Sequence, residues 1–444
     1  MDHELRDSRD AILSSHRSRR SFDAAQGHNA SQSPCREPSS AREKDLLITP
    51  ADKVTRILQS CRDNDLDALT ALATSPGGFV DDGTRKTAWP VLLGSVAGSG
   101  TIATDEDETW RSLPRHRDED QVRLDVDRSF VYYPNDQSEK QIQVKKQELS
   151  DLITKTLRKH PALCYFQGYH DIVQVFLLVL GVARAPPAVE RLSLLRIRDF
   201  MLPSLSAAIS HLQLLPSILH ASDPVLCKHV EGTQPFFALA ATLTLYAHDI
   251  QEYGDIARLF DFLLAHEAVV SVYLYAEIIL SRKQELLEID DDEPEMLHFT
   301  LSKLPNPLNL EHLISETVVL FQKYPPESLP FRAWRSISSY SVLKTTRSPR
   351  QLAGQTLDDG QVLFDKQAAQ MRRAHAVQQV MKDTKRLMWV YRRPAGTLSL
   401  TILIGLLALW LGKHGAAGNS PLASSATTWG PTLGTLVAFL RGHR

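Results

Sequence analysis

Two short segments of the chain carry side chains that could act on a phosphoryl group. Arg128 follows Asp125 within Val122–Phe130, and Gln167 lies between an aromatic residue and a glycine within Cys164–Asp171. An arginine can neutralise the charge that develops on a transferred phosphoryl group, and a glutamine can orient the attacking water. Together they are the two residue types that rapid hydrolysis of GTP requires.

The spacing around Arg128 predicts that a helix presents the arginine. Val122, Asp125 and Arg128 follow one another at i, i+3 and i+6, which places them on one helical face. On this interpretation Asp125 holds the end of the helix that carries the arginine. The alternative is an exposed Asp–Arg pair without a catalytic role. Gln167 has a similar alternative, in which it only caps a helix that starts near Tyr169.

The remaining apolar patterns have helical spacing, and no strand-like alternation is sustained, so the fold is expected to be all-α. The very apolar run Ile172–Ala183 is too short to cross a bilayer and is interpreted as a buried core helix. The other helical patterns start near Pro50 and continue over Gln137–Lys159, Pro235–Ile250, Ile256–Leu264, Val269–Leu280 and Met296–Tyr324.

Three motifs, in order, resemble the signatures of the TBC-domain family, the GTPase-activating proteins for Rab GTPases. The matching positions are Arg85 and Trp89 for R-x-x-x-W, Val122, Asp125 and Arg128 for IxxDxxR, and Tyr165, Gln167 and Gly168 for YxQG. Each motif is weak alone, but three in the right order form a specific signal.

The resemblance implies a multi-helix TBC domain over residues 49–330, with its motif core at about 79–285. It implies that Arg128 and Gln167 are catalytic residues supplied in trans, so the protein activates an enzyme rather than being one. The implied partner is a GTP-bound Rab GTPase. No cofactor is expected, because GTP and magnesium belong to that partner.

The other signature residues are expected to support these two. Asp125 would hold the arginine's segment, while Tyr165 and Gly168 would shape the turn that presents Gln167. Arg85 is expected to orient its corner through a buried ion pair, and Trp89 to anchor the core. Two alternatives from other classes are a catalytically silent Rab-binding scaffold on a membrane and an unrelated anchored helical adaptor.

Composition excludes several other functions. A formal net charge of −2 argues against an electrostatic nucleic-acid binder. The four cysteines include no CxxC pair, which argues against a zinc site or a disulfide framework. His170 and Asp171 do not predict a metal site, because neighbouring residues on a helix point apart. Cys164 has no base placed for it by any motif.

The C-terminal part predicts a membrane anchor. Residues 331–393 hold thirteen Lys and Arg against four Asp and Glu, a net of +9, and we treat 331–394 as a basic juxtamembrane segment. Residues 395–412 carry no charge, and at about 1.5 Å per residue they span about 27 Å as a helix. These residues are therefore expected to form a single transmembrane helix.

The basic flank places the TBC domain in the cytosol and the tail 413–444 in the lumen. The patch 429–440 leaves open a re-entrant hairpin, and the Arg/Ser-rich segment 1–48 is expected to be disordered, with Asn29 unglycosylated. The anchored architecture resembles the endoplasmic-reticulum branch of the family, which implies an endoplasmic-reticulum membrane location and a role in endoplasmic-reticulum-to-Golgi vesicle traffic.

Overall fold

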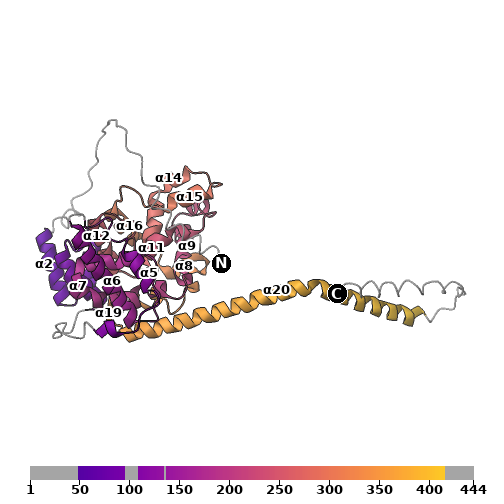
Figure 1. Ribbon diagram of the computed structural model, residues 1–444. Coiled ribbons are helices and arrows are strands. Elements are labelled where there is room, and N and C mark those ends of the chain that lie inside the picture. The colour runs from indigo at the N-terminus through magenta and orange to yellow at the C-terminus, as the bar shows by residue number, and fades with distance from the viewer. Residues whose placement is uncertain (1–48, 96–108, 135–136, 416–444) are drawn as a thin grey trace, which may run out of the picture. The chain divides into compact units, whose positions relative to one another are not determined.

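The computed structural model describes residues 49–95, 109–134 and 137–415, and all regular elements in these ranges are helical (Figure 1). The all-α prediction is confirmed for this part of the chain. The predictions for residues 1–48 and 416–444, including those for Asn29 and the patch 429–440, lie outside the described residues.

The first group of elements carries all three motifs. It comprises α2 (Pro50–Arg62), α3 (Leu66–Thr74), α4 (Asp82–Leu93), the 3₁₀ turn η2 (Thr109–Ser112), α5 (Glu119–Val126), α6 (Glu139–Lys159) and α7 (Tyr169–Arg191). Local capping explains several of the starting points. The side chains of Thr49, Asp65 and Asp81 each accept a backbone N–H at the beginning of α2, α3 and α4.

The second group completes the domain. It comprises η3 (Leu192–Arg196), η4 (Arg198–Met201), α8 (Ser206–Leu212), α9 (Leu214–Ser222), α10 (Pro224–His229), η5 (Pro235–Ala238), α11 (Leu239–Leu243), α12 (Tyr253–Ala265), α13 (Val270–Ser281), α14 (Lys283–Leu287), α15 (Pro294–Leu301) and α16 (Leu310–Lys323). The last elements are η6 (Pro326–Ser328), η7 (Pro330–Arg332), α17 (Ala333–Ser336), α18 (Val342–Thr345), α19 (Pro349–Gly354) and α20 (Leu357–Gly415).

Helix α7 buries most of its apolar side chains and packs against α4, α6 and α12. An aromatic cluster joins three of these helices, with the Trp89 ring 5.3 Å from Phe176 and 5.9 Å from Phe260. Among the described residues, only this helix, continued to Arg196, is long and apolar enough to cross a membrane, but most of its side chains are buried in the domain. The prediction of a buried core helix is therefore confirmed.

Two helices end earlier than the sequence patterns predict. Helix α5 ends at Val126, so Arg128 lies in the turn that follows it rather than on the helix itself. The pattern Pro235–Ile250 is not one helix, because α11 ends at Leu243 and both Leu245 and Tyr246 have positive φ. Such backbone is unfavourable for these residue types. Burial of both side chains, and a hydrogen bond from the Tyr246 hydroxyl to Ser271, oppose that cost.

The compact unit extends to Gln370, past the expected boundary at residue 330. Trp334, Leu343 and Phe364 are buried, although they lie in the segment that was expected to be juxtamembrane. The buried Asp199 carboxylate accepts hydrogen bonds from the Ser341 hydroxyl and from the backbone N–H of residue 342 at 3.1 Å. The high density of basic residues conceals this apolar pattern in the sequence.

Candidate functional site

Asp125 fixes the segment that carries Arg128. Its carboxylate is fully buried, whereas the Arg128 side chain is 53% exposed. The Arg128 guanidinium donates to one carboxylate oxygen of Asp125, and the Gln121 amide donates to the same oxygen at 3.1 Å. The alternative interpretation was an exposed Asp–Arg pair. In the structure only the arginine of this pair is exposed, and the carboxylate lies inside the domain. The arginine reaches solvent from a fixed base.

Tyr165 joins this cluster from the second motif. Its hydroxyl donates to Asp125 at 2.9 Å, and its backbone N–H donates to Asp118 at 2.9 Å. Burial raises the pKa of Tyr165 well above its usual value, and the nearby charge of Asp125 adds to this effect. The phenol therefore keeps its proton and remains a donor at neutral pH. A hydrogen bond from Tyr165 to Asp125 therefore joins the motif that carries the arginine to the motif that carries the glutamine.

Gln167 and Gly168 form the turn that leads into α7. Gly168 has a φ of 101°, and a Cβ atom at this position would lie 2.5 Å from Thr244. Only glycine meets both conditions without a shift of the surrounding structure. The N-cap position of α7 is Gly168, and no side-chain capping bond is present, so the alternative in which Gln167 caps this helix is wrong.

One pocket brings the two candidate side chains together. Arg128 and Gln167 both line it, and the other walls are the segment 129–133, the start of α7 and residues 240–248. Asp125 and Tyr165 are not among the lining residues, but Asp125 binds both the Arg128 guanidinium and the Tyr165 hydroxyl. The chemistry available here is a half-exposed cation and an amide that line one pocket.

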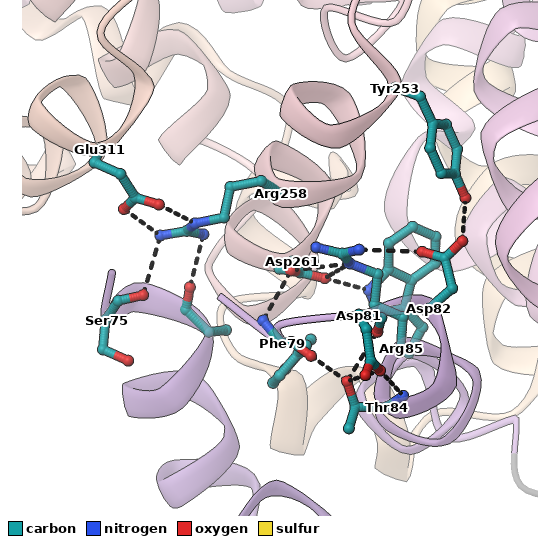
Figure 2. Close-up of polar contacts among 12 residues, drawn as sticks. Ser75, Phe79, Asp81, Asp82, Thr84, Arg85, Tyr253, Arg258, Asp261 and Glu311 are labelled. Atoms are coloured by element: carbon teal, nitrogen blue, oxygen red, sulfur yellow. Dashed lines mark hydrogen bonds and ion pairs between the residues drawn. The ribbon is translucent and has the colours of Figure 1, made fainter. Parts of the chain in front are cut away.

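Arg85 lies in a different cluster, around Asp261 of α12 (Figure 2), and Trp89 belongs to the same cluster. The Arg85 Nε atom is 3.1 Å from Asp261, and the Trp89 ring N–H donates to the same carboxylate at 2.8 Å. The backbone N–H of Phe79 donates to it at 2.9 Å. Burial alone would lower the pKa of Arg85, but the charge of Asp261 raises it, so the arginine stays ionised. The buried ion pair expected of Arg85 and the core position expected of Trp89 are both present.

A match to the family model for the Rab-GTPase-TBC domain covers residues 82–287. The GTPase-activating protein gyp10 of Schizosaccharomyces pombe is 31% identical to this chain over 313 residues, which cover 70% of the chain and 82% of that protein. Human TBC1 domain family member 20 is 31% identical over 395 residues, which cover 88% of the chain and 93% of that protein. The chain belongs to the TBC-domain family. The crystal structure of the Ypt/Rab-GAP domain of Gyp1p aligns with a TM-score of 0.49 at 14% identity, covering 62% of this chain and 99% of that one.

Three residues outside the three signature motifs complete these clusters. Asp261 is the partner of both Arg85 and Trp89, although 176 positions separate it from the arginine. Glu311 binds the Arg258 guanidinium with contacts of 2.7 Å and 2.9 Å, beside the loop that precedes Phe79 (Figure 2). His248 lines the pocket. Asp261 lies in the segment 253–262, whose Arg258 and Asp261 resemble an arginine and an aspartate late in TBC domains, so the sequence did carry a signal for it. Glu311 and His248 lie in no such segment, and only an alignment of related sequences could have singled them out.

The described part of the TBC domain contains no group of His, Cys, Asp and Glu that could hold a metal ion. His170 instead forms a hydrogen bond with Tyr165, with 3.1 Å between the imidazole Nδ1 and the hydroxyl oxygen. Burial raises the pKa of Cys164, so its sulfur is a thiol at neutral pH rather than a nucleophilic thiolate.

Removing Arg85 should destabilise the TBC domain strongly. Arg85→Met would leave the Asp261 carboxylate buried without its counter-charge, which costs about 3–5 kcal/mol. Arg111→Met is the matched control, because Arg111 pairs with Asp151 while half of its side chain is exposed. This change should cost less than about 1 kcal/mol. Urea unfolding followed by tryptophan fluorescence would measure both, and equal losses would contradict a special role for the buried pair.

Proposed function

We propose that this protein accelerates GTP hydrolysis by a Rab GTPase, to which it supplies Arg128 and Gln167. The observation that carries the proposal is that both side chains line one pocket and come from motifs joined by the Asp125–Tyr165 hydrogen bond. An arginine supplied in trans is worth roughly 10³–10⁵ in rate, or about 4–7 kcal/mol of the barrier. GTP and magnesium are bound by the GTPase, and the protein contributes no cofactor.

The geometry fits a division of roles between the two residues. Arg128 is anchored at Asp125 but remains 53% exposed, so its guanidinium can turn toward the γ-phosphate of a docked nucleotide. Gln167 lies on a turn whose backbone is fixed by Gly168 and Thr244. A fixed turn suits a residue that must place a water molecule within a narrow range of positions.

The test is a GTP-hydrolysis assay of the full chain in detergent micelles against a panel of GTP-loaded Rab proteins. At least one Rab should be accelerated strongly. Binding to a Rab without acceleration would support the silent scaffold instead. Absence of both binding and acceleration across the panel would reject the proposed function.

The protein is proposed to act at the endoplasmic-reticulum membrane, in traffic from the endoplasmic reticulum to the Golgi. Residues 395–412 lie within the helical stretch of α20. The described apolar side chains there are exposed, for example Leu403 (63%), Leu409 (72%) and Trp410 (57%). A helix with this composition gains free energy when a bilayer removes these side chains from water. The apolar helix Leu400–Lys413 is by itself too short for a span, so the proposal includes the uncharged residues from Ala395 onward.

The orientation of the anchor has its own test. A protease added outside sealed microsomes should digest the segment from Met1 to about residue 390 and spare a tag placed after Arg444. Asn29 should carry no glycan, because it would face the cytosol. A glycan on Asn29, or digestion of the C-terminal tag in intact microsomes, would contradict this orientation.

A further inference from the structure

The pocket that holds Arg128 and Gln167 has a wall that comes from a distant part of the chain. Residues 240–248 supply it, and they approach α7 because the backbone reverses at Leu245 and Tyr246. This wall touches the glutamine turn at Thr244, whose methyl group faces Gly168. It touches the start of α7 at His248, whose Nδ1 atom lies 3.1 Å from an Asp171 carboxylate oxygen.

A chain of polar contacts leads from His248 to the arginine. Asp171 lies 3.2 Å from the Nε2 atom of His170. The Nδ1 atom of His170 lies 3.1 Å from the Tyr165 hydroxyl. Because that hydroxyl donates its one proton to Asp125, its oxygen is left to accept from His170. Asp125 then accepts from the Arg128 guanidinium. The contacts are continuous between the two ends of the pocket when both ring nitrogens of His170 carry a proton, because Nδ1 then donates to Tyr165 and Nε2–H faces the Asp171 carboxylate.

The surroundings of His248 favour its charged form. The hydrogen bond to Asp171 raises the pKa of the His248 ring, and burial opposes this effect without cancelling it. Asp249 adds to the increase, whereas Arg128 opposes it. The charged groups that act on the ring are Asp171, Asp249 and Arg128. The titratable residues that line the same pocket are Tyr132, Tyr133 and His170.

We propose that His248 is a positioning residue for Arg128 and Gln167, and that it acts through Asp171. It would hold the start of α7 against the wall 240–248, so that the glutamine turn and the Tyr165 hydroxyl keep their places. This inference rests on the proposed function, because its effect is on the stimulated hydrolysis of GTP. It differs from a general packing role, because a charged hydrogen bond rather than apolar contact transmits the effect.

The experiment uses the full chain in detergent micelles and a GTP-loaded Rab that the wild-type protein accelerates. His248→Ala should lower the stimulated kcat about tenfold, as expected for the loss of one charge-assisted hydrogen bond. KM for the Rab should change by less than about threefold, because the lost hydrogen bond is internal and orders the two catalytic side chains. His248→Asn should recover most of the activity, because its amide can donate to Asp171 where Nδ1 does. His312→Ala, at an exposed histidine of α16, is the matched control.

A double variant tests whether the effect passes through Asp171. Asp171→Asn should lower kcat about as much as His248→Ala, and the two changes together should cause little further loss. Independent contributions would instead multiply. If His248→Ala fails to fold, Asp171→Asn alone still tests the proposal, because asparagine preserves the shape of the aspartate side chain.

The pH profile supplies a readout that a merely structural role would not change. The raised pKa means that His248 is protonated at low pH and loses its proton as pH rises through that value. The stimulated kcat of the wild-type protein should fall over that interval relative to His248→Asn, which has no titrating ring. The GTPase is the same in both assays, so its own titration cancels in the ratio.

Three outcomes would overturn the inference. The first is an unchanged kcat in His248→Ala. The second is a double variant whose loss of kcat is the product of the two single losses. The third is a loss of kcat that His248→Asn does not rescue and that accompanies a lowered melting temperature. Failure of the proposed function is distinguishable from all three, because then the wild-type protein itself would accelerate no Rab.

Discussion

Arg128→Ala should lower the stimulation of Rab GTP hydrolysis by at least about a hundredfold. The arginine contributes charge to the transition state, and no other cation is placed by motif to replace it. The fold should survive, because Arg128 is 53% exposed, unlike the buried Arg85, and the Asp125 carboxylate keeps its hydrogen bonds from Gln121 and Tyr165. Arg128→Lys should recover little activity, since a lysine lacks the planar fork that can bind two phosphate oxygens.

The measurement is single-turnover hydrolysis with excess activator, which separates the chemical step from binding. Arg123→Ala is the matched control, because Arg123 lies on α5 with 71% of its side chain exposed. It should retain nearly full activity. Near-normal stimulation by Arg128→Ala would show that another residue supplies the catalytic charge. Near-normal stimulation by Arg128→Lys would show that the planar fork of the arginine is not required.

Gln167→Ala should abolish the acceleration of a Rab whose own catalytic glutamine has been changed to leucine or alanine. An activator that supplies only an arginine depends on the glutamine of the GTPase, whereas a two-residue mechanism does not. A glutamine side chain can accept from the attacking water through its carbonyl oxygen and donate through its amide. Its position beside Arg128 in one pocket is consistent with that role.

The crippled Rab should still be accelerated substantially by the wild-type protein. Gln147→Ala, at an exposed glutamine of α6, controls for the loss of an amide elsewhere. The assignment of Gln167 is wrong if the wild-type protein does not accelerate GTP hydrolysis by the Rab variant that lacks its own glutamine. It is also wrong if Gln167→Ala leaves that acceleration unchanged.

Local chemistry determined much of this protein. The helical spacing of apolar residues from Pro50 onward predicted the first helices near their observed positions, because amphipathic spacing acts over a few residues. The capping bonds of Thr49 and Asp65, which are equally local, were found only in the structure. The motifs identified the family and predicted Arg128 and Gln167 as its catalytic residues here, because their residue types and order are specific. The apolar run in α7 predicted a buried helix from its length and composition alone.

The tertiary structure decided which distant groups complete the two clusters. Asp261 neutralises Arg85 from α12, and His248 reaches Asp171 only because the chain turns back at Leu245 and Tyr246. Such turns depend on burial that the local sequence does not encode, so the helical pattern over 235–250 predicted a longer helix than exists. Burial also explains why residues 331–370 belong to the compact unit, although the sequence predicted a juxtamembrane segment there. Their basic residues indicate a surface segment, whereas the cost of leaving Trp334 and Leu343 in water places them against the domain.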